Sequence, residues 1–205
     1  MNETSIKSTI LGHIKDSKKH SVFFTRDFTE QTTPENVKKI LREACAVGLL
    51  KRVAQGIYVK PMNSRFGEVP LPMEVIAQEI ADRDHVQIMP TGSTATNIVG
   101  LSTQVPMITS FITTGSSRTI KIGNQIIKFR HAAPRNFAYK GKTIPLLVQA
   151  LKEIEQTNIH NAELFAISQY MNRVKDKETF ASDILIAPQW IRGILRPIIM
   201  QITQL

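Results

Sequence analysis

Hydroxyl, amide and basic side chains recur at helical spacing between residues 33 and 42. They are Thr33, Asn36, Lys38, Lys39 and Arg42. Lysine and arginine bind phosphate oxygens, and arginine and asparagine also match the hydrogen-bonding edges of guanine and adenine. These residue types therefore favour non-covalent recognition of DNA, in which phosphate contacts give affinity and base contacts give specificity.

A second set of basic and amide side chains follows soon after in the chain. Its members are Lys51, Arg52, Gln55 and Lys60. Polar and apolar residues alternate here, and the Gln55–Gly56 pair is typical of a hairpin turn. We expect this basic hairpin to reach the phosphate backbone beside the groove that the preceding helix enters.

A helix with one apolar face must position the first set. The residues of that face recur at helical spacing and are Val37, Ile40, Leu41, Ala44 and Val47. Thr33 is placed to cap the helix, Pro34 suits its first turn, and Gly48 suits its end. The pattern predicts a helix that starts at Pro34 and ends before Gly48.

The elements predicted on either side of this helix follow one another in the order of a known DNA-binding motif. Residues 22–24 suit a short strand, Thr25 to Phe28 suit a brief helix, and the N-terminal segment has an apolar stripe of Ile6, Ile10 and Ile14. Helix, strand, helix, turn, helix and hairpin is the order of a winged helix-turn-helix. The second helix of that unit usually enters the DNA major groove.

The composition restricts the class of protein and of partner. The chain has 205 residues, with 26 Lys+Arg against 17 Asp+Glu and a formal charge of +9. This balance favours polyanionic partners. Cys45 is the only cysteine, so a disulfide within the chain is excluded. We expect a soluble cytoplasmic protein, because neither a signal peptide nor a long apolar run is present.

The chain is long enough for two domains, and its pattern predicts a mixed α/β fold. We expect a winged helix-turn-helix domain at 1–62, a proline-rich linker at 63–72 and an α/β domain at 73–205 that ends in helices. Within the last domain, 73–84 reads as a helix with Val75, Ile76 and Ile80 on one side. Three strand-like runs fall between residues 107 and 130.

A second basic region lies in the α/β domain. No Asp or Glu occurs from His85 to Leu151. The basic residues that we group as a patch there are Arg118, Lys121, Lys128, Arg130 and Arg135. We expect the patch to contact DNA that flanks the winged-helix site. An acidic protein partner is the alternative.

The case for catalysis is weak. Gly92–Ser93 is similar to the step that opens nucleotidyltransferase sites, but that chemistry needs downstream carboxylates to hold Mg²⁺, and no acid follows until Glu153. The Gly115–Arg118 segment lacks the spacing of a phosphate-binding loop. We therefore expect no catalytic residues, no metal and no cofactor. A nucleotide-handling transferase that uses Ser93 or Gly115–Arg118 is the alternative.

The chain resembles the AbiEi antitoxin family of type IV toxin–antitoxin, abortive-infection systems. The resemblance spans residues 5–153 and depends on the runs FTRDFTEQTTPENVKKILREACAVGLLKRVAQGIYVKP, PTGSTATNIVGLSTQVP and SFITTGSSRTIKIGNQIIKFRHA. It implies a winged-helix repressor that binds its own operator in double-stranded DNA. It further implies a phage-defence antitoxin that counters a nucleotidyltransferase-like toxin without a stable complex. We expect the chain to be a monomer or a homodimer.

Overall fold

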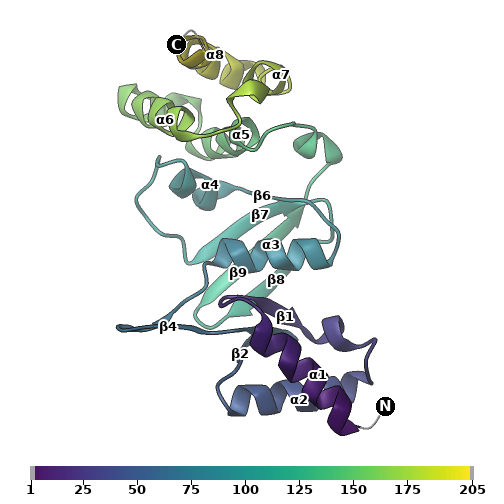
Figure 1. The fold of residues 1–205 in the computed structure, drawn as a ribbon. Helices are drawn as coiled ribbons and strands as arrows, with labels where there is room; N and C mark the ends of the chain where they lie inside the picture. Colours follow the sequence, from purple (N-terminus) through teal and green to yellow (C-terminus); the bar gives the residue numbers. More distant parts are fainter. Residues whose placement is uncertain (1–2, 204–205) are drawn as a thin grey trace. The chain divides into compact units, whose positions relative to one another are not determined.

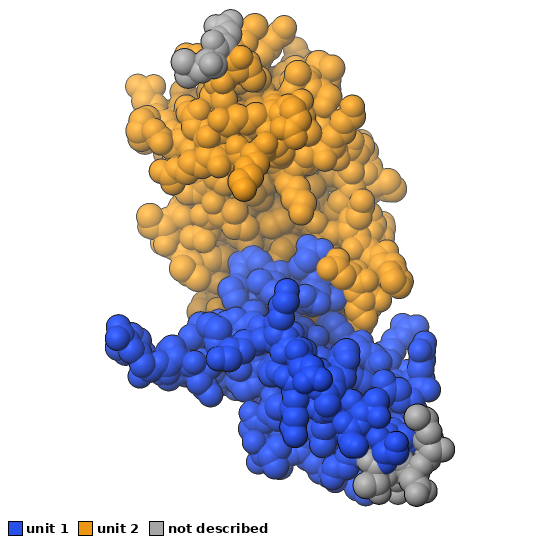
Figure 2. All heavy atoms as spheres, viewed as in Figure 1, with its two compact units in different colours: residues 1–79, 121–123 blue, residues 80–120, 124–205 orange. Residues whose placement is uncertain are grey.

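The protein has a mixed α/β fold in a computed structural model that describes residues 3–203. The chain divides into two compact units (Figure 2). Unit 1 runs to Glu79 and includes Lys121–Gly123, whereas unit 2 comprises Ile80–Ile120 and Asn124 onward. No helix in the described part of the chain is long and apolar enough to cross a membrane.

Unit 1 begins with the elements that the sequence predicts. They are α1 (Glu3–Asp16), β1 (Val22–Phe24), a short 3-10 helix η1 (Thr25–Phe28), α2 (Pro34–Ala46), β2 (Lys51–Ala54) and β3 (Ile57–Val59) (Figure 1). The strands form an antiparallel sheet in the order β1-β3-β2. Ile10 and Ile14 of α1, Phe23 of β1 and Phe28 of η1 pack with α2 in one apolar core.

Local sequence explains the bounds of α2. The Thr33 hydroxyl accepts a hydrogen bond from the Asn36 amide at 3.4 Å, and Gly48 has a φ of 72°, which suits the end of a helix. The apolar stripe is buried at Val37, Ile40, Leu41 and Ala44. The prediction was wrong at Val47, which is 79% exposed because it lies just after the helix ends.

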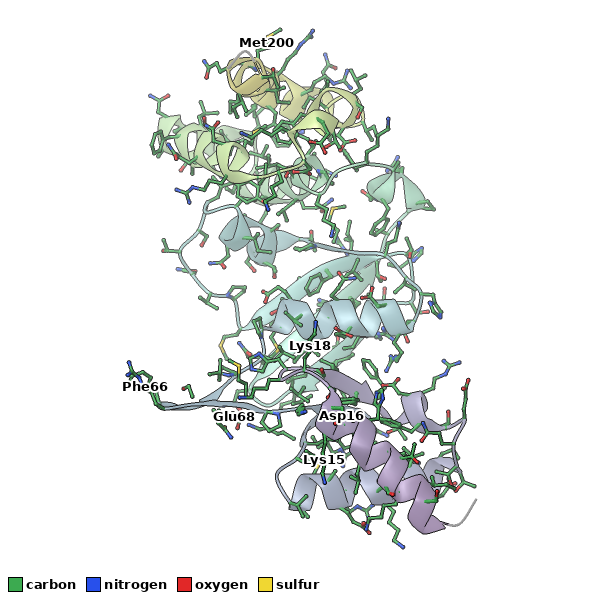
Figure 3. The ribbon with its side chains drawn as sticks, viewed as in Figure 1. Lys15, Asp16, Lys18, Phe66, Glu68 and Met200 are labelled. Carbon is green, nitrogen blue, oxygen red and sulfur yellow. The ribbon has the colours of Figure 1, made fainter. Side chains whose placement is uncertain are left out.

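The segment that we expected to be a linker contains a hairpin. Strands β4 (Met62–Ser64) and β5 (Gly67–Val69) pair antiparallel, and Phe66 is 86% exposed at the tip (Figure 3). Helix α3 (Met73–Arg83) follows. Ile76 and Ile80 of α3 are buried as predicted, but Val75 is exposed, since it lies one residue outside the buried face.

Unit 2 contains a four-stranded sheet with a parallel pair. Its strands are β6 (Ile88–Pro90), β7 (Ile108–Thr113), β8 (Arg118–Ile122) and β9 (Gln125–His131), in the order β6-β7-β9-β8. β6 and β7 are antiparallel, whereas β7 and β9 are parallel, with Ser110 opposite Lys128. Helix α4 (Gly92–Ile98) packs against β7.

Helices form the rest of unit 2. They are η2 (Pro134–Phe137), α5 (Thr143–Ile154), η3 (Gln156–Asn158), α6 (Asn161–Arg173), η4 (Lys177–Thr179), α7 (Phe180–Asp183) and α8 (Gln189–Thr203) (Figure 1). Every residue of α5 from Thr143 to Leu151 is buried. α4 packs against α5, and α6 and α8 complete the same apolar core.

Two carboxylates hold the backbone at the start of α5. Asp183 accepts hydrogen bonds from the amides of Lys140 at 2.8 Å and Gly141 at 2.7 Å, and Asp176 accepts those of Lys142 and Thr143. Burial raises the pKa of Asp176, but the hydrogen bonds from Thr143 and Lys142 outweigh it and leave that pKa below its ordinary value. The carboxylates thus accept hydrogen bonds from the amide of Thr143, which α5 itself leaves without an acceptor, and from the amides of the three residues before the helix.

Candidate nucleic-acid interface

A groove of about 440 Å³ runs between α2 and the β2–β3 hairpin in unit 1. Helix α2 contributes Lys38 and Arg42, which are four residues apart and therefore share one face. The hairpin contributes Arg52 from β2 and Gln55 from the turn. The fold thus brings four of the predicted side chains to one concave surface, here called the α2 groove.

These side chains are available for a ligand. Lys38, Arg42 and Gln55 are exposed and form no hydrogen bond or ion pair with any described residue. Arg52 is exposed too, and only its Nε is engaged, since it donates to the Ala54 carbonyl at 3.3 Å. Three cations without a carboxylate partner give the α2 groove a positive potential, which favours phosphate.

Three other predicted residues of α2 lie outside the lining of the groove. Thr33 caps the helix, and the Asn36 side-chain amide donates to the Thr32 hydroxyl at 3.0 Å, so both stabilise the helix start. Lys39 is exposed, and its charge helps to lower the pKa of Glu43, after the larger effect of the hydrogen bond from Lys7. The side-chain oxygen of Asn36 accepts no hydrogen bond from the described residues.

Two predicted phosphate contacts are engaged within the chain instead. The Lys60 ammonium donates to the carbonyls of Ile14, Lys15 and Ser17 at 2.6–2.9 Å, which uses all three of its hydrogens at the end of α1. Lys51 pairs with Glu68 of β5 at 2.8 Å. The prediction missed these roles because each partner lies far away in sequence. We therefore leave Lys60 out of the candidate interface.

The Lys60→Met substitution should lower the free energy of unfolding by about 2 kcal/mol, since three carbonyls at the end of α1 lose a charged donor. Urea unfolding followed by circular dichroism measures the loss. Lys19→Met is the control, because Lys19 is exposed and its side chain forms no hydrogen bond with the described residues. A stable Lys60→Met variant with weakened DNA binding would instead make Lys60 part of the interface.

The α2 groove also includes side chains that the sequence did not indicate. Tyr58 of β3 lies directly across from Arg52, and Cys45 and Thr25 contribute to the lining. Burial raises the pKa of the Cys45 thiol, which disfavours the nucleophilic thiolate. The alternation of the two hairpin strands is the signal that places Tyr58 opposite Arg52.

One member of the predicted second basic patch, Arg118, is engaged within the chain. Arg118 pairs with Asp84, and its guanidinium lies 5.2 Å from the centre of the Phe129 ring. Hydrogen bonds from Arg83 and then Arg118 hold the pKa of Asp84 below its ordinary value, although burial opposes them. The acid-free run misled the prediction here, because Asp84 directly precedes it.

The other members of the patch lie on β8, η2 and β9. Lys121 belongs to unit 1, and Arg135 is exposed in η2. Lys128 and Arg130 lie two apart on β9, as predicted for one face, and both line a cavity of about 260 Å³ in unit 2. Within the predicted patch, this pair brings together two cations that have no partner among the described residues.

Residues 9–179 match the model of a family of unknown function, DUF6088. The chain belongs to this family. No curated protein matches the chain. The DUF6088 match includes the α2 groove and the Lys128–Arg130 pair, and the family's description gives no activity. The function of this DUF6088 chain is therefore argued from its geometry.

Proposed function

We propose that the chain is a DNA-binding transcriptional repressor, and that unit 1 is its winged helix-turn-helix. The observation that carries the proposal is the α2 groove, where Lys38 and Arg42 of one helix meet Arg52 and Gln55 of a hairpin. Three cations and an amide are the donor set that phosphates and base edges require.

The proposed arrangement follows from size and chemistry. The B-DNA major groove admits one α-helix, and α2 has thirteen residues with an exposed polar face. Arg42 and Asn36 would face base edges, whereas Lys38, Lys39 and Arg52 would neutralise phosphates. Gln55, at the hairpin turn, would reach the adjacent backbone.

The resemblance to AbiEi proteins supports two finer parts of the proposal. The first is autoregulation, in which the chain represses transcription from DNA upstream of its own gene. The second is an antitoxin role against a nucleotidyltransferase-like toxin, and it depends on the resemblance alone. Co-expression with the product of the adjacent gene tests it, since rescue of growth by this chain is the expected result and continued arrest the contrary one.

A reporter fused to the DNA upstream of the gene tests autoregulation in cells that lack the chain. Expression of the wild-type chain should lower transcription, and the Lys38→Glu/Arg42→Glu variant at equal abundance should not, because the groove would then repel phosphate. A reporter that responds equally to both proteins, or to neither, would contradict repression through the α2 groove.

A further inference from the structure

The cavity beside Lys128 and Arg130 is built from four segments of unit 2 that are distant in sequence. Gly92 and Ser93 begin α4, Ser110 lies on β7, and Glu153 lies in the last turn of α5. The parallel register places Ser110 directly opposite Lys128, and Arg130 follows on the same face of β9. The fold therefore brings side chains from α4, β7, β9 and α5 together around one cavity.

The backbone around Gly92 fixes one wall of the cavity. Gly92 has a φ of 61°, a conformation that glycine adopts without strain. The Glu153 carboxylate lies against it, with Oε2 3.6 Å from the position that a Cβ at Gly92 would take. Glu153, which is far from Gly92 in sequence, therefore lies next to it in the fold.

The charges around the cavity have no partners among the residues that the structure describes. Lys128, Arg130 and Glu153 form no hydrogen bond or ion pair with any described residue, although they line the same space. Likewise, the hydroxyls of Ser93 and Ser110 donate no hydrogen bond within the described chain. Two neighbouring cations and two free hydroxyls favour an anion with several oxygens, as phosphate has.

The Glu153 carboxylate further restricts which anions fit the cavity. A simple anion would be repelled by Glu153, whereas a ligand that carries a hydroxyl next to its phosphate would donate to that carboxylate. The volume of about 260 Å³ is small for a binding pocket and suits a phosphate with part of a sugar. These features together fit a phosphorylated sugar.

We infer that this cavity binds the phosphate and ribose of a mononucleotide. Lys128, Arg130 and the two serine hydroxyls hold the phosphate, and Glu153 accepts a hydrogen bond from a ribose hydroxyl. The inference concerns binding and includes no covalent step. It is independent of the proposed DNA binding, because every lining residue belongs to unit 2 and the α2 groove belongs to unit 1.

Isothermal titration calorimetry of the full chain tests the site. The probes are adenosine, guanosine, cytidine and uridine 5′-monophosphates, ribose 5-phosphate, its 2-deoxy analogue and inorganic phosphate. We expect at least one ribonucleotide to bind more tightly than inorganic phosphate. Lys128→Ala and Arg130→Ala should each weaken it at least about tenfold, the effect of one lost charged contact.

Two further variants distinguish binding in this cavity from non-specific attraction of the nucleotide to a basic protein surface. Arg135→Ala, which removes an exposed cation that does not line the cavity, should leave nucleotide affinity unchanged. Glu153→Gln should retain phosphate binding and lose the preference for ribose over 2-deoxyribose phosphate, because the carboxylate acceptor is replaced by an amide.

Three results would overturn the inference. They are no heat of binding with any nucleotide at millimolar concentration, equal affinity in the Arg130→Ala variant, and equal losses from Arg130→Ala and Arg135→Ala. If Lys128→Ala/Arg130→Ala weakens DNA binding and no nucleotide binds, the pair serves duplex phosphates instead. The Lys38→Glu/Arg42→Glu variant should still bind nucleotide, so failure of one proposal is separable from failure of the other.

Discussion

Reversal of charge at Lys38 and Arg42 is expected to lower the DNA affinity of the full chain at least about 100-fold, or about 2.7 kcal/mol. Both side chains line the α2 groove, and neither has a partner in the described chain. The variant Lys38→Glu/Arg42→Glu removes two attractive contacts and places two carboxylates against phosphate. Fluorescence anisotropy of a labelled duplex at about 100 mM salt measures the change.

The matched control reverses two charges outside the α2 groove. Lys15 and Lys18 are exposed at and after the end of α1 (Figure 3), and they do not line the groove. Because salt screens charges beyond about 10 Å at this ionic strength, Lys15→Glu/Lys18→Glu should weaken binding only a few-fold. Equal losses in the two variants would show that net charge, and not the α2 groove, determines affinity.

The substitution Asp183→Ala is expected to lower the free energy of unfolding of unit 2 by about 3 kcal/mol or more. Asp183 is fully buried and accepts two backbone amides, so alanine leaves both donors without an acceptor beside the start of α5. The backbone packs closely here, since a Cβ at Gly141 would overlap the Thr179 and Asp176 side chains.

Fluorescence of Trp190 during urea unfolding measures this loss within unit 2. Trp190 is the only tryptophan, and it packs against the core that α5 and α8 share. Glu178→Ala is the control, because Glu178 is exposed in the neighbouring η4 and should change stability little. An Asp183→Ala variant as stable as the control would mean that the two amides find other acceptors.

The sequence predicted those parts of the fold that depend on neighbouring residues. The cap at Thr33, the glycine at 48 and the spacing of Val37, Ile40 and Leu41 are local, and α2 has the expected bounds. The order of the sheet in unit 2 depends on long-range pairing. Nothing local to β7 or β9 shows that they run parallel, with Ser110 opposite Lys128.

In the candidate sites too, the sequence predicted local features and missed contacts between residues that are distant in the chain. Helical spacing placed Lys38 and Arg42 on one face, and the hairpin pattern placed Arg52 beside them. Sequence distance hid the ion pair of Lys51 with Glu68 and the approach of Glu153 to Gly92. A side chain's type predicts what it is able to bind, but only the folded chain shows whether an internal partner already occupies it.

Direct titration of the wild-type chain into a duplex from upstream of its own gene is the most decisive measurement. At about 100 mM salt we expect saturable binding in the submicromolar range, with unrelated duplexes bound more weakly by a factor of about 1,000. The logarithm of affinity should fall with the logarithm of salt concentration at a slope of about −3 or steeper, since at least three groove cations displace counterions. No saturable binding of folded protein to any duplex at about 50 mM salt would contradict the proposed function.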